Sequence, residues 1–318
     1  MKRLDFTRAL SATAFGTAAG PAAAQTTTDL TTIRLGTNVN NDSTPLFWAV
    51  TSGIFARAGL KVDIQKFNSG TVAIAALVGG SLDIARGSLL PLISARAHGI
   101  PIQIVAPAEL SVVGDSSEGI VALKESTVTT GKDLNGATMP VPALHDFDEV
   151  STRAWIDATG GDSKTVKFIE LPSSAVLASL LAGRVKAAFL SDPFLTSAVA
   201  SGRTKVIAHP NASIAPRFLI TCYCSTETFV DKNRAAIRRF ADALGRSATY
   251  TNAHHAEVLA TVAPFWGVDP AVVNAMTPTV GASRLDPREI QPLLDAALRY
   301  GVIPAPITAK SMIAPGVI

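Results

Sequence analysis

Short strands and helices alternate along this chain from residue 33 onward, and that alternation restricts the fold more than any other feature of the sequence. Leu60–Phe67 alternates apolar and polar side chains as a half-buried strand does, whereas Phe47, Val50 and Ile54 recur at the spacing of one helix face. The same patterns predict strands at 33–36, 60–67, 82–85 and 102–106, separated by helices at 45–57, 72–78 and 89–98. This order is typical of an α/β sheet covered by helices on both faces.

A second unit of the same kind begins near Gly119. Strands are expected at 120–123, 137–141, 166–171, 187–190, 206–208 and 218–224, with helices at 146–159, 174–182, 230–251, 254–265, 270–277 and 287–300. The chain is expected to cross between the two units near Pro107–Val112 and again near Pro216–Cys224. Two crossings predict a molecule of two lobes with a cleft between them.

The first residues have the pattern of an export signal. Met1–Arg8 is basic, Ala9–Gly20 is apolar, and Pro21–Ala24 supplies small residues, so a secretory signal peptide (1–24) cleaved near Ala24 is predicted. Its apolar part is too short to span a bilayer, and no Cys near the cleavage point could carry a lipid anchor. A periplasmic protein is therefore expected, exported by either the general or the twin-arginine route.

Charge and length exclude several classes of protein. The 318 residues include 28 Lys and Arg against 25 Asp and Glu, and the chain without residues 1–25 has a net charge of +1. This near-neutral balance gives no electrostatic reason to expect nucleic acid or a membrane surface as a partner. A chain of this length buries enough surface to fold without a disulfide framework or a structural metal.

The sequence motifs of common enzyme classes are missing. There is no GxSxG, Walker, HExxH or GxGxxG motif in a suitable position. His254, His255 and Glu257 are interpreted as a solvated helix face rather than a metal site, because adjacent helix residues point about 100° apart. His145 and Asp146 beside Ser151 are interpreted as a loop and a helix cap. We expect no catalytic residue, metal or cofactor.

Cys222 and Cys224 flank Tyr223 on a predicted strand, so both thiols should point to the same face of the sheet. A disulfide between them would be strained. Two small apolar side chains packed on one face are the favoured interpretation, and a labile disulfide stays open in an export compartment.

Polar and small residues follow the ends of successive predicted strands, where ligands bind in open α/β sheets. These turns are 37–43, 68–71, 86–88, 142–146 and 191–193. Any one of them also suits an ordinary turn or helix cap. Their recurrence at the same end of the strands favours a ligand site there.

The chain resembles the extracytoplasmic substrate-binding proteins of ABC importers, of the nitrate, sulfonate and taurine type. The residues that carry the resemblance extend over almost the whole chain after the signal in the right order: 45–50, 53–55, 59–62, 80–85, 133–136, 171–172, 180–188 and 192–193. The resemblance implies the α/β type II periplasmic-binding-protein fold, with two α/β lobes joined by two hinge crossings. The expected domains are lobe 1 at 25–112, lobe 2 at 113–216, and a return strand with a helical C-terminal part at 217–318 that completes lobe 1.

The resemblance also implies where a ligand binds. Backbone N–H groups at Ser69, Gly70 and Thr71 would meet a polar or anionic ligand, and Arg86 would pair with a carboxylate or sulfonate unless it instead neutralises Asp83 or Asp42. Trp48 would stack on a planar ligand unless it belongs to the core of its lobe. The full set of expected ligand-binding residues is Asn38, Asn40, Asp42, Ser43, Trp48, Ser69, Gly70, Thr71, Arg86, Ser88, His145 and Asp192. Asp192 stands where the family commonly has Glu, which leaves the ligand class open.

The expected function is capture of a small polar or anionic organic solute, such as a sulfonate or carboxylate, by a monomer that delivers it to a membrane permease. A pyrimidine-type heteroaromatic is the alternative ligand, suited to Trp48, Asp42 and Asp192. Two other functions stay open: a periplasmic sensor partner, and an enzyme of the kind found in yeast pyrimidine-precursor synthases. The latter carry a Cys-rich motif that this chain lacks.

Overall fold

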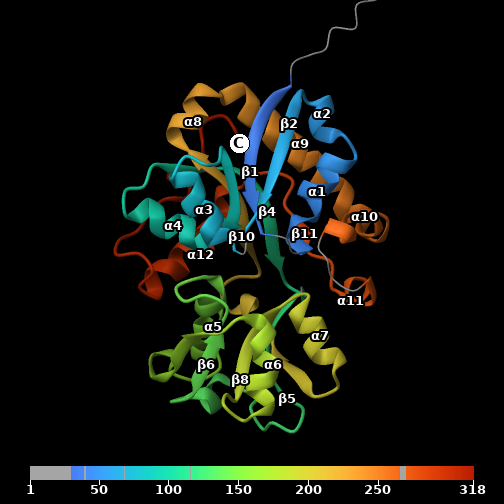
Figure 1. Ribbon diagram of the computed structural model, residues 1–318. Coiled ribbons are helices and arrows are strands. Elements are labelled where there is room, and N and C mark those ends of the chain that lie inside the picture. The colour runs from blue at the N-terminus through green and yellow to red at the C-terminus, as the bar shows by residue number, and fades with distance from the viewer. Residues whose placement is uncertain (1–29, 39–40, 68, 115, 266–269) are drawn as a thin grey trace, which may run out of the picture.

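The computed structural model describes residues 30–38, 41–67, 69–114, 116–265 and 270–318. The predicted signal peptide lies outside these residues. The described chain forms two α/β lobes, one above the other in Figure 1, each built on its own β-structure. The predicted fold class of two α/β lobes joined by two crossings is confirmed. The order of the strands in each lobe determines which residues lie near the candidate site.

Lobe 1 contains a six-stranded sheet in the order β11-β4-β10-β3-β1-β2. Its strands are β1 (Thr31–Thr37), β2 (Leu60–Lys66), β3 (Ile84–Ser88), β4 (Ile102–Val112), β10 (Arg217–Thr226) and β11 (Val280–Gly281). β1 pairs in parallel with β2 and β3, whereas β10 runs antiparallel to both β3 and β4. Because β10 belongs to the returning chain, the last third of the sequence completes the sheet that the first third begins.

Lobe 2 repeats this strand order on a smaller scale. Its strands are β5 (Glu118–Leu123), β6 (Thr138–Val141), β7 (Lys167–Glu170), β8 (Ala187–Ser191) and β9 (Thr204–Ala208). β5 is antiparallel to β8 and β9, β6 is parallel to β7, and β6 packs beside β8. The resulting spatial order, β7-β6-β8-β5-β9, matches β2-β1-β3-β10-β4 of lobe 1.

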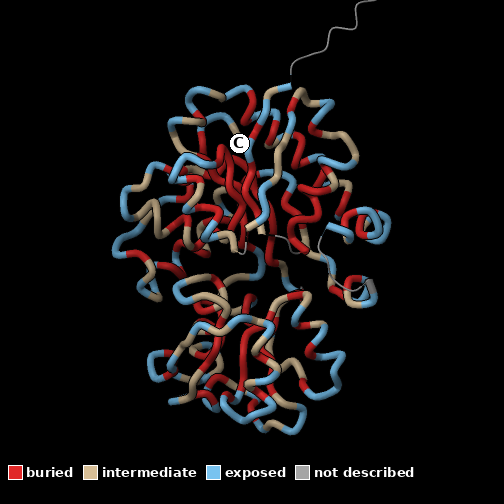
Figure 2. Tube along the Cα trace, viewed as in Figure 1, coloured by how far each residue is buried: buried red, intermediate tan, exposed pale blue. Residues whose placement is uncertain are grey.

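Helices cover the sheets, and their buried faces form the cores. In lobe 1 the helices are α1 (Thr44–Thr51), α2 (Ile54–Arg57), α3 (Gly70–Val78), α4 (Leu89–Ala97), α8 (Glu227–Lys232), α9 (Arg234–Ala253), α10 (His255–Val262), α11 (Pro270–Ala275), α12 (Pro287–Arg299) and α13 (Ala309–Met312). Lobe 2 has α5 (Phe147–Ala158), α6 (Ser173–Leu181) and α7 (Phe194–Ala200). Short 3₁₀ turns lie at Asn41–Ser43, Gly131–Leu134, Ser163–Thr165, Pro210–Ser213 and Ala263–Phe265. Figure 2 shows the buried residues concentrated along the strands in both lobes.

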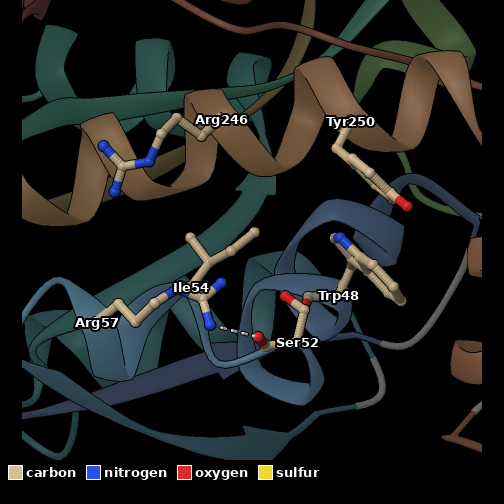
Figure 3. A pocket seen from close by; sticks show the side chains of 6 residues that line it. All are labelled: Trp48, Ser52, Ile54, Arg57, Arg246 and Tyr250. Carbon is tan, nitrogen blue, oxygen red and sulfur yellow. Dashed lines mark hydrogen bonds between the residues drawn. The ribbon is translucent and has the colours of Figure 1, made fainter.

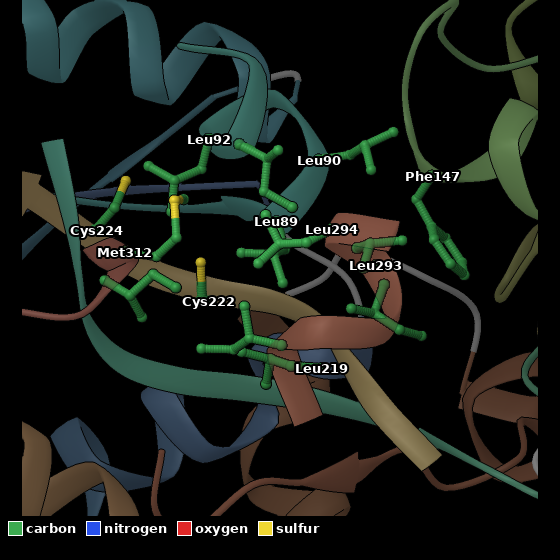
Figure 4. Close-up of a cluster of buried hydrophobic side chains, with 14 of the residues drawn as sticks. Leu89, Leu90, Leu92, Phe147, Leu219, Cys222, Cys224, Leu293, Leu294 and Met312 are labelled. Atoms are coloured by element: carbon green, nitrogen blue, oxygen red, sulfur yellow. The ribbon is translucent and has the colours of Figure 1, made fainter. Parts of the chain in front are cut away.

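The two faces of the lobe 1 sheet have separate cores. One face packs on α3, α4 and α12, and the other on α1, α2 and α9. Cys222 and Cys224 lie in the first core and Tyr223 in the second, so the predicted shared face of the two thiols is confirmed (Figure 4). Both cysteines are free and buried. Burial raises the pKa of the Cys222 thiol well above its usual range and that of Cys224 to about 12.

Three predicted elements differ from those observed. Gly53 has a φ of 74°, so the helix expected at 45–57 is divided into α1 and α2. The helix expected at 230–251 is divided at Asn233. The turn expected at 86–88 is wrong: Arg86, Gly87 and Ser88 are the end of β3, because each pairs with a residue of β10. That pairing is nonlocal, and local sequence patterns do not reveal it.

The two crossings between the lobes run side by side. β4 and β10 are paired out to Val112 and Arg217, and the Val113 amide donates to the Pro216 carbonyl at 3.0 Å. The chain thus leaves lobe 1 and returns to it at one place. The predicted lobe boundaries at 112/113 and 216/217 remain a proposal, which this pairing supports.

Candidate ligand site between the lobes

A buried ion pair lies at the end of lobe 1 that faces lobe 2. Arg86 on β3 is 1% exposed, and its guanidinium forms an ion pair with Asp42. Arg86 also donates to Asn38 Oδ1 at 2.8 Å, and the Thr221 hydroxyl donates to Asp42 Oδ2 at 3.2 Å. Removing one partner of such a pair would leave an uncompensated buried charge, at a cost of about 3–5 kcal/mol. Asp83, the other partner considered for Arg86, pairs with Arg34 instead.

The 3₁₀ turn Asn41–Ser43 contains Asp42 itself and places two further buried polar residues, Asn41 and Ser43, beside this pair. The Asn41 side-chain amide donates to the Thr277 carbonyl at 2.7 Å. Oδ1 of Asn41 and Oδ1 of Asp42 are both buried and accept no hydrogen bond from the described residues. Buried acceptors of this kind are costly unless water or a ligand supplies donors. Asn40, also predicted for the site, lies outside the described residues.

Thr277 connects the two lobes. Its backbone amide donates to Asp192 Oδ2 of lobe 2 at 3.2 Å, and its hydroxyl lies 3.0 Å from the Ser116 hydroxyl. Oδ1 of Asp192 accepts from the amide and the hydroxyl of Thr196, at 3.0 and 2.6 Å. Asp192, predicted as a site residue, is 7% exposed. It contacts the same threonine as Asn41 of lobe 1, because Asn41 donates to the Thr277 carbonyl and Asp192 accepts from the Thr277 amide.

Acidic residues at the start of α5 form the lobe 2 side of the site. Asp146 caps α5 by accepting from the Phe147 amide at 2.6 Å. Burial raises the pKa of the Asp146 carboxyl, and the Ser88 hydroxyl of lobe 1 lies near enough to oppose that rise. The pKa of Asp148 is raised well above its usual range by burial and by the charges of Asp146 and Glu118. Ser88 and Asp146 thus place a predicted residue of lobe 1 against lobe 2.

Apolar packing supports the same contact between lobes. Phe147 follows the cap of α5, and its ring lies 6.0 Å from that of Phe218 on β10. Phe147 and Val150 belong to the lobe 1 core that includes Leu219 and Leu293 (Figure 4). The start of α5 is consequently held against lobe 1.

The predicted residues at the start of α3 have mainly structural contacts. The Ser69 hydroxyl accepts from the Val72 amide at 3.3 Å and so caps α3. A Cβ added to Gly70 would lie 2.5 Å from the Cα of Gly87 on β3, so only glycine allows this close approach. Thr71 is exposed. Their role in ligand binding stays a prediction.

Three further predicted residues can be placed. Ser43 is buried in the 3₁₀ turn beside Asp42. His145 is exposed with a left-handed φ of 58°, and its backbone amide donates to Glu149 Oε2 at 2.8 Å. Trp48 lies on α1 and stacks on Tyr250 of α9, with ring centroids 5.2 Å apart. Figure 3 shows Trp48 lining a pocket of about 480 Å³ with Ser52, Ile54, Arg57, Arg246 and Tyr250, between α1, α2 and α9.

Several residues of the site were missed by sequence reasoning. Asn41 lies in a turn that was identified, but Thr221 and Thr277 are far from it along the chain and carry no motif. Asp146 was interpreted as a helix cap, which it is, and its position against lobe 1 depends on the relative placement of the lobes. Only the assembled fold reveals these contacts.

Two properties of the described residues bear on the type of site. No group of three or more His, Cys, Asp or Glu side chains in this part of the chain is arranged to hold a metal ion. Within the same residues, no helix combines the length and the apolar character needed to cross a membrane.

The two lobes and the paired crossings form the two-lobed fold of the periplasmic binding proteins. The chain is similar to the periplasmic aliphatic sulphonate-binding protein SsuA of Escherichia coli, with a TM-score of 0.75 at 18% identity, over 90% of this chain and 98% of that one. The predicted type II fold is thus confirmed. Residues 26–264 match the model of the NMT1-like family, and the chain belongs to that family.

Two relatives are similar in sequence over part of their length. The formylaminopyrimidine-binding protein of Halalkalibacterium halodurans is 29% identical over 142 residues, which are 45% of this chain and 41% of the relative. The taurine-binding periplasmic protein of Escherichia coli K12 is 28% identical over 146 residues, 46% of this chain and 44% of the relative. The chain therefore spans less than half the length of the curated relatives it matches.

The fold is not confined to binding proteins. The desulfurization enzyme DszB is similar with a TM-score of 0.65 at 16% identity, over 90% of this chain and 97% of that one. Function therefore has to be inferred from the site rather than from the fold.

Proposed function

We propose that this protein is the solute-binding component of an ABC importer, which captures a small polar organic solute between its lobes and delivers it to a membrane permease. One observation carries the proposal: buried polar groups from both lobes converge at one place, where Asn41 Oδ1 and Asp42 Oδ1 accept no hydrogen bond from the described residues. A solute held there would touch both lobes at once and so favour their closed arrangement. The names of the two curated relatives, both binding proteins, agree with it.

Export belongs to the same proposal. Residues 1–24 would act as a signal peptide cleaved near Ala24, and the mature chain would work in the periplasm as a monomer. The basic start, apolar middle and small residues before Gln25 support this.

The cysteines support binding rather than catalysis. Catalytic cysteines act as thiolates in partly exposed positive surroundings. Here Cys222 and Cys224 are buried in an apolar core, with the pKa of each thiol raised. They are therefore unsuited to nucleophilic chemistry, although the fold is shared with the enzyme DszB.

The proposal is tested with protein from which copurified solute has been removed by unfolding and refolding. Ligand at about a hundred times its dissociation constant should add roughly 2.7 kcal/mol of stability, which a thermal shift detects. Small-angle scattering with and without that ligand should show a smaller radius of gyration in the bound form. A ligand that is chemically converted during incubation, detected by mass spectrometry, would instead indicate an enzyme.

A further inference from the structure

The orientation of Asn41 determines what the site can accept. Its side-chain Nδ2 donates to the Thr277 carbonyl at 2.7 Å, and a carbonyl can only accept. The opposite atom, Oδ1, is therefore an acceptor, and it is buried without a donor from the described residues. Asn41 is 4% exposed, so the packing holds this acceptor in place.

Asp42 supplies a second acceptor next to the first. Its Oδ2 receives Arg86 and Thr221, whereas its Oδ1 is buried and has no donor among the described residues. Asp42 is 5% exposed. Two buried acceptors from consecutive residues, each without a donor among the described residues, call for donors from water or a ligand.

The charges around these acceptors disfavour an anion. Arg86 is a cation at this place, but Asp42 already balances its charge, and the side chain is almost fully buried. Across the junction lie Asp146, beside Ser88, and Asp148, which both Asp146 and Glu118 influence electrostatically. Among the described residues Arg86 is the cation at this place, and it is already paired with the Asp42 carboxylate, so a negatively charged ligand would compete with Asp42 for the same guanidinium, which costs affinity.

We infer that the junction binds a neutral or cationic solute that presents at least two N–H donors, such as an amidine, a primary amine or an amino-substituted heterocycle, to Asn41 Oδ1 and Asp42 Oδ1. The inference rests on the proposed function and specifies its ligand class. Of the two ligand classes expected from the sequence, it selects donor-bearing heteroaromatics over sulfonates and carboxylates.

The test uses ligand pairs that match in shape and differ in charge and donors. Isothermal titration calorimetry would use the refolded chain without the predicted signal peptide. It would compare benzamidine with benzoate, 2-aminopyrimidine with pyrimidine-2-carboxylate, and ethylamine with ethanesulfonate. The donor-bearing member of at least one pair should bind roughly tenfold or more tightly than its anionic partner.

Variants locate the binding to these two acceptors. Asn41→Ala leaves the Arg86–Asp42 pair intact and should weaken binding of the donor ligand roughly tenfold, as should Asp42→Asn. The matched control is Asp83→Asn, which breaks the ion pair with Arg34 elsewhere in lobe 1 and should leave the affinity unchanged. Circular dichroism verifies that each variant folds. If Asp42→Asn does not fold, the affinity of Asn41→Ala alone tests the inference.

The outcomes separate this inference from the proposed function. Equal or tighter binding of the anionic members, or unchanged affinity in Asn41→Ala, would overturn the ligand class or its placement while solute binding itself stands. If no member of any pair binds, and a wider panel of small solutes neither binds nor reduces the radius of gyration, the proposed function and this inference are both overturned.

Discussion

Asp148 lies in the first turn of α5, where burial and two neighbouring carboxylates raise the pKa of its side chain. Between the unfolded value of about 3.9 and the raised value, the folded chain holds a proton that the unfolded chain has lost. The free energy of unfolding therefore falls as pH rises through this interval. Asp133 behaves oppositely, because hydrogen bonds from Thr129 and Thr130 lower its pKa.

Replacing Asp148 tests this assignment. Asp148→Asn should be more stable than the parent near neutral pH, and the difference should shrink as the pH falls and disappear below about 3.9, where the parent carboxyl is protonated in both states. Urea unfolding followed by circular dichroism at several pH values measures it. Asp133→Asn is the contrasting control, expected to lose stability near neutral pH. A pH-independent gain in Asp148→Asn would contradict the raised pKa.

Sequence reasoning predicted only part of the candidate site at the level of single residues. It predicted Asp42, Arg86 and Asp192 as site residues, because polar residues that follow predicted strands can be recognised from the sequence alone. It left open whether Arg86 pairs with Asp42 or Asp83, since only the fold places Asp42 beside Arg86 and Asp83 beside Arg34. Thr277 gave no signal, since its contact with Asn41 spans 236 residues.

At the scale of elements, α3 and β3 pack closely through two glycines. Gly70 begins α3, and Gly87 lies within β3 beside it. The sequence predicts a turn at 86–88. Pairing with β10 instead extends β3 through these residues and brings Gly87 against the start of α3. Strands such as β4, β5 and β8 were nevertheless predicted from their apolar patterns, because most of their residues are buried.

A methyl group at Gly70 should disrupt this packing. Its Cβ would lie 2.5 Å from the Gly87 Cα, a backbone atom, so Gly70→Ala should destabilise the protein by about 1–3 kcal/mol. Gly79 at the other end of α3 has a φ of −72°, and the nearest atom to an added Cβ is 3.5 Å away. Gly79→Ala should therefore be neutral or slightly stabilising. Denaturant midpoints compare the two, and similar losses would refute the packing explanation.

At the scale of the whole molecule, the two lobes share few but specific polar contacts. Thr277 links Asn41 of lobe 1 to Asp192 of lobe 2, and the Tyr300 hydroxyl donates to Asp157 of α5 at 3.1 Å. The alternation of strands and helices predicted two lobes and the approximate places of the crossings. It did not predict which residues touch across the junction, because that depends on how two separately folded units are placed.

Removing the link at Asp192 should shift the lobes toward an open arrangement. Asp192→Ala loses the acceptor for the Thr277 amide, so without ligand its radius of gyration by small-angle scattering should exceed that of the parent. Asp162→Ala is the control, because Asp162 caps a 3₁₀ turn within lobe 2 by accepting from the Lys164 amide. An unchanged radius in Asp192→Ala would show that this contact does not hold the lobes together.

The hydrogen bond between Val113 and Pro216 has a consequence for how the chain can be divided. Because Val112 and Arg217 are paired residues of adjacent antiparallel strands, all of 113–216 occupies the position of a hairpin turn. A two-residue Asn-Gly turn could in principle replace it and leave the lobe 1 sheet connected. Such a shortened protein would lose the apolar cover that Phe147 and Val150 of lobe 2 give to the lobe 1 core around Phe218. In terms of connectivity, lobe 2 is an insertion at a single position of lobe 1, between the paired ends of β4 and β10.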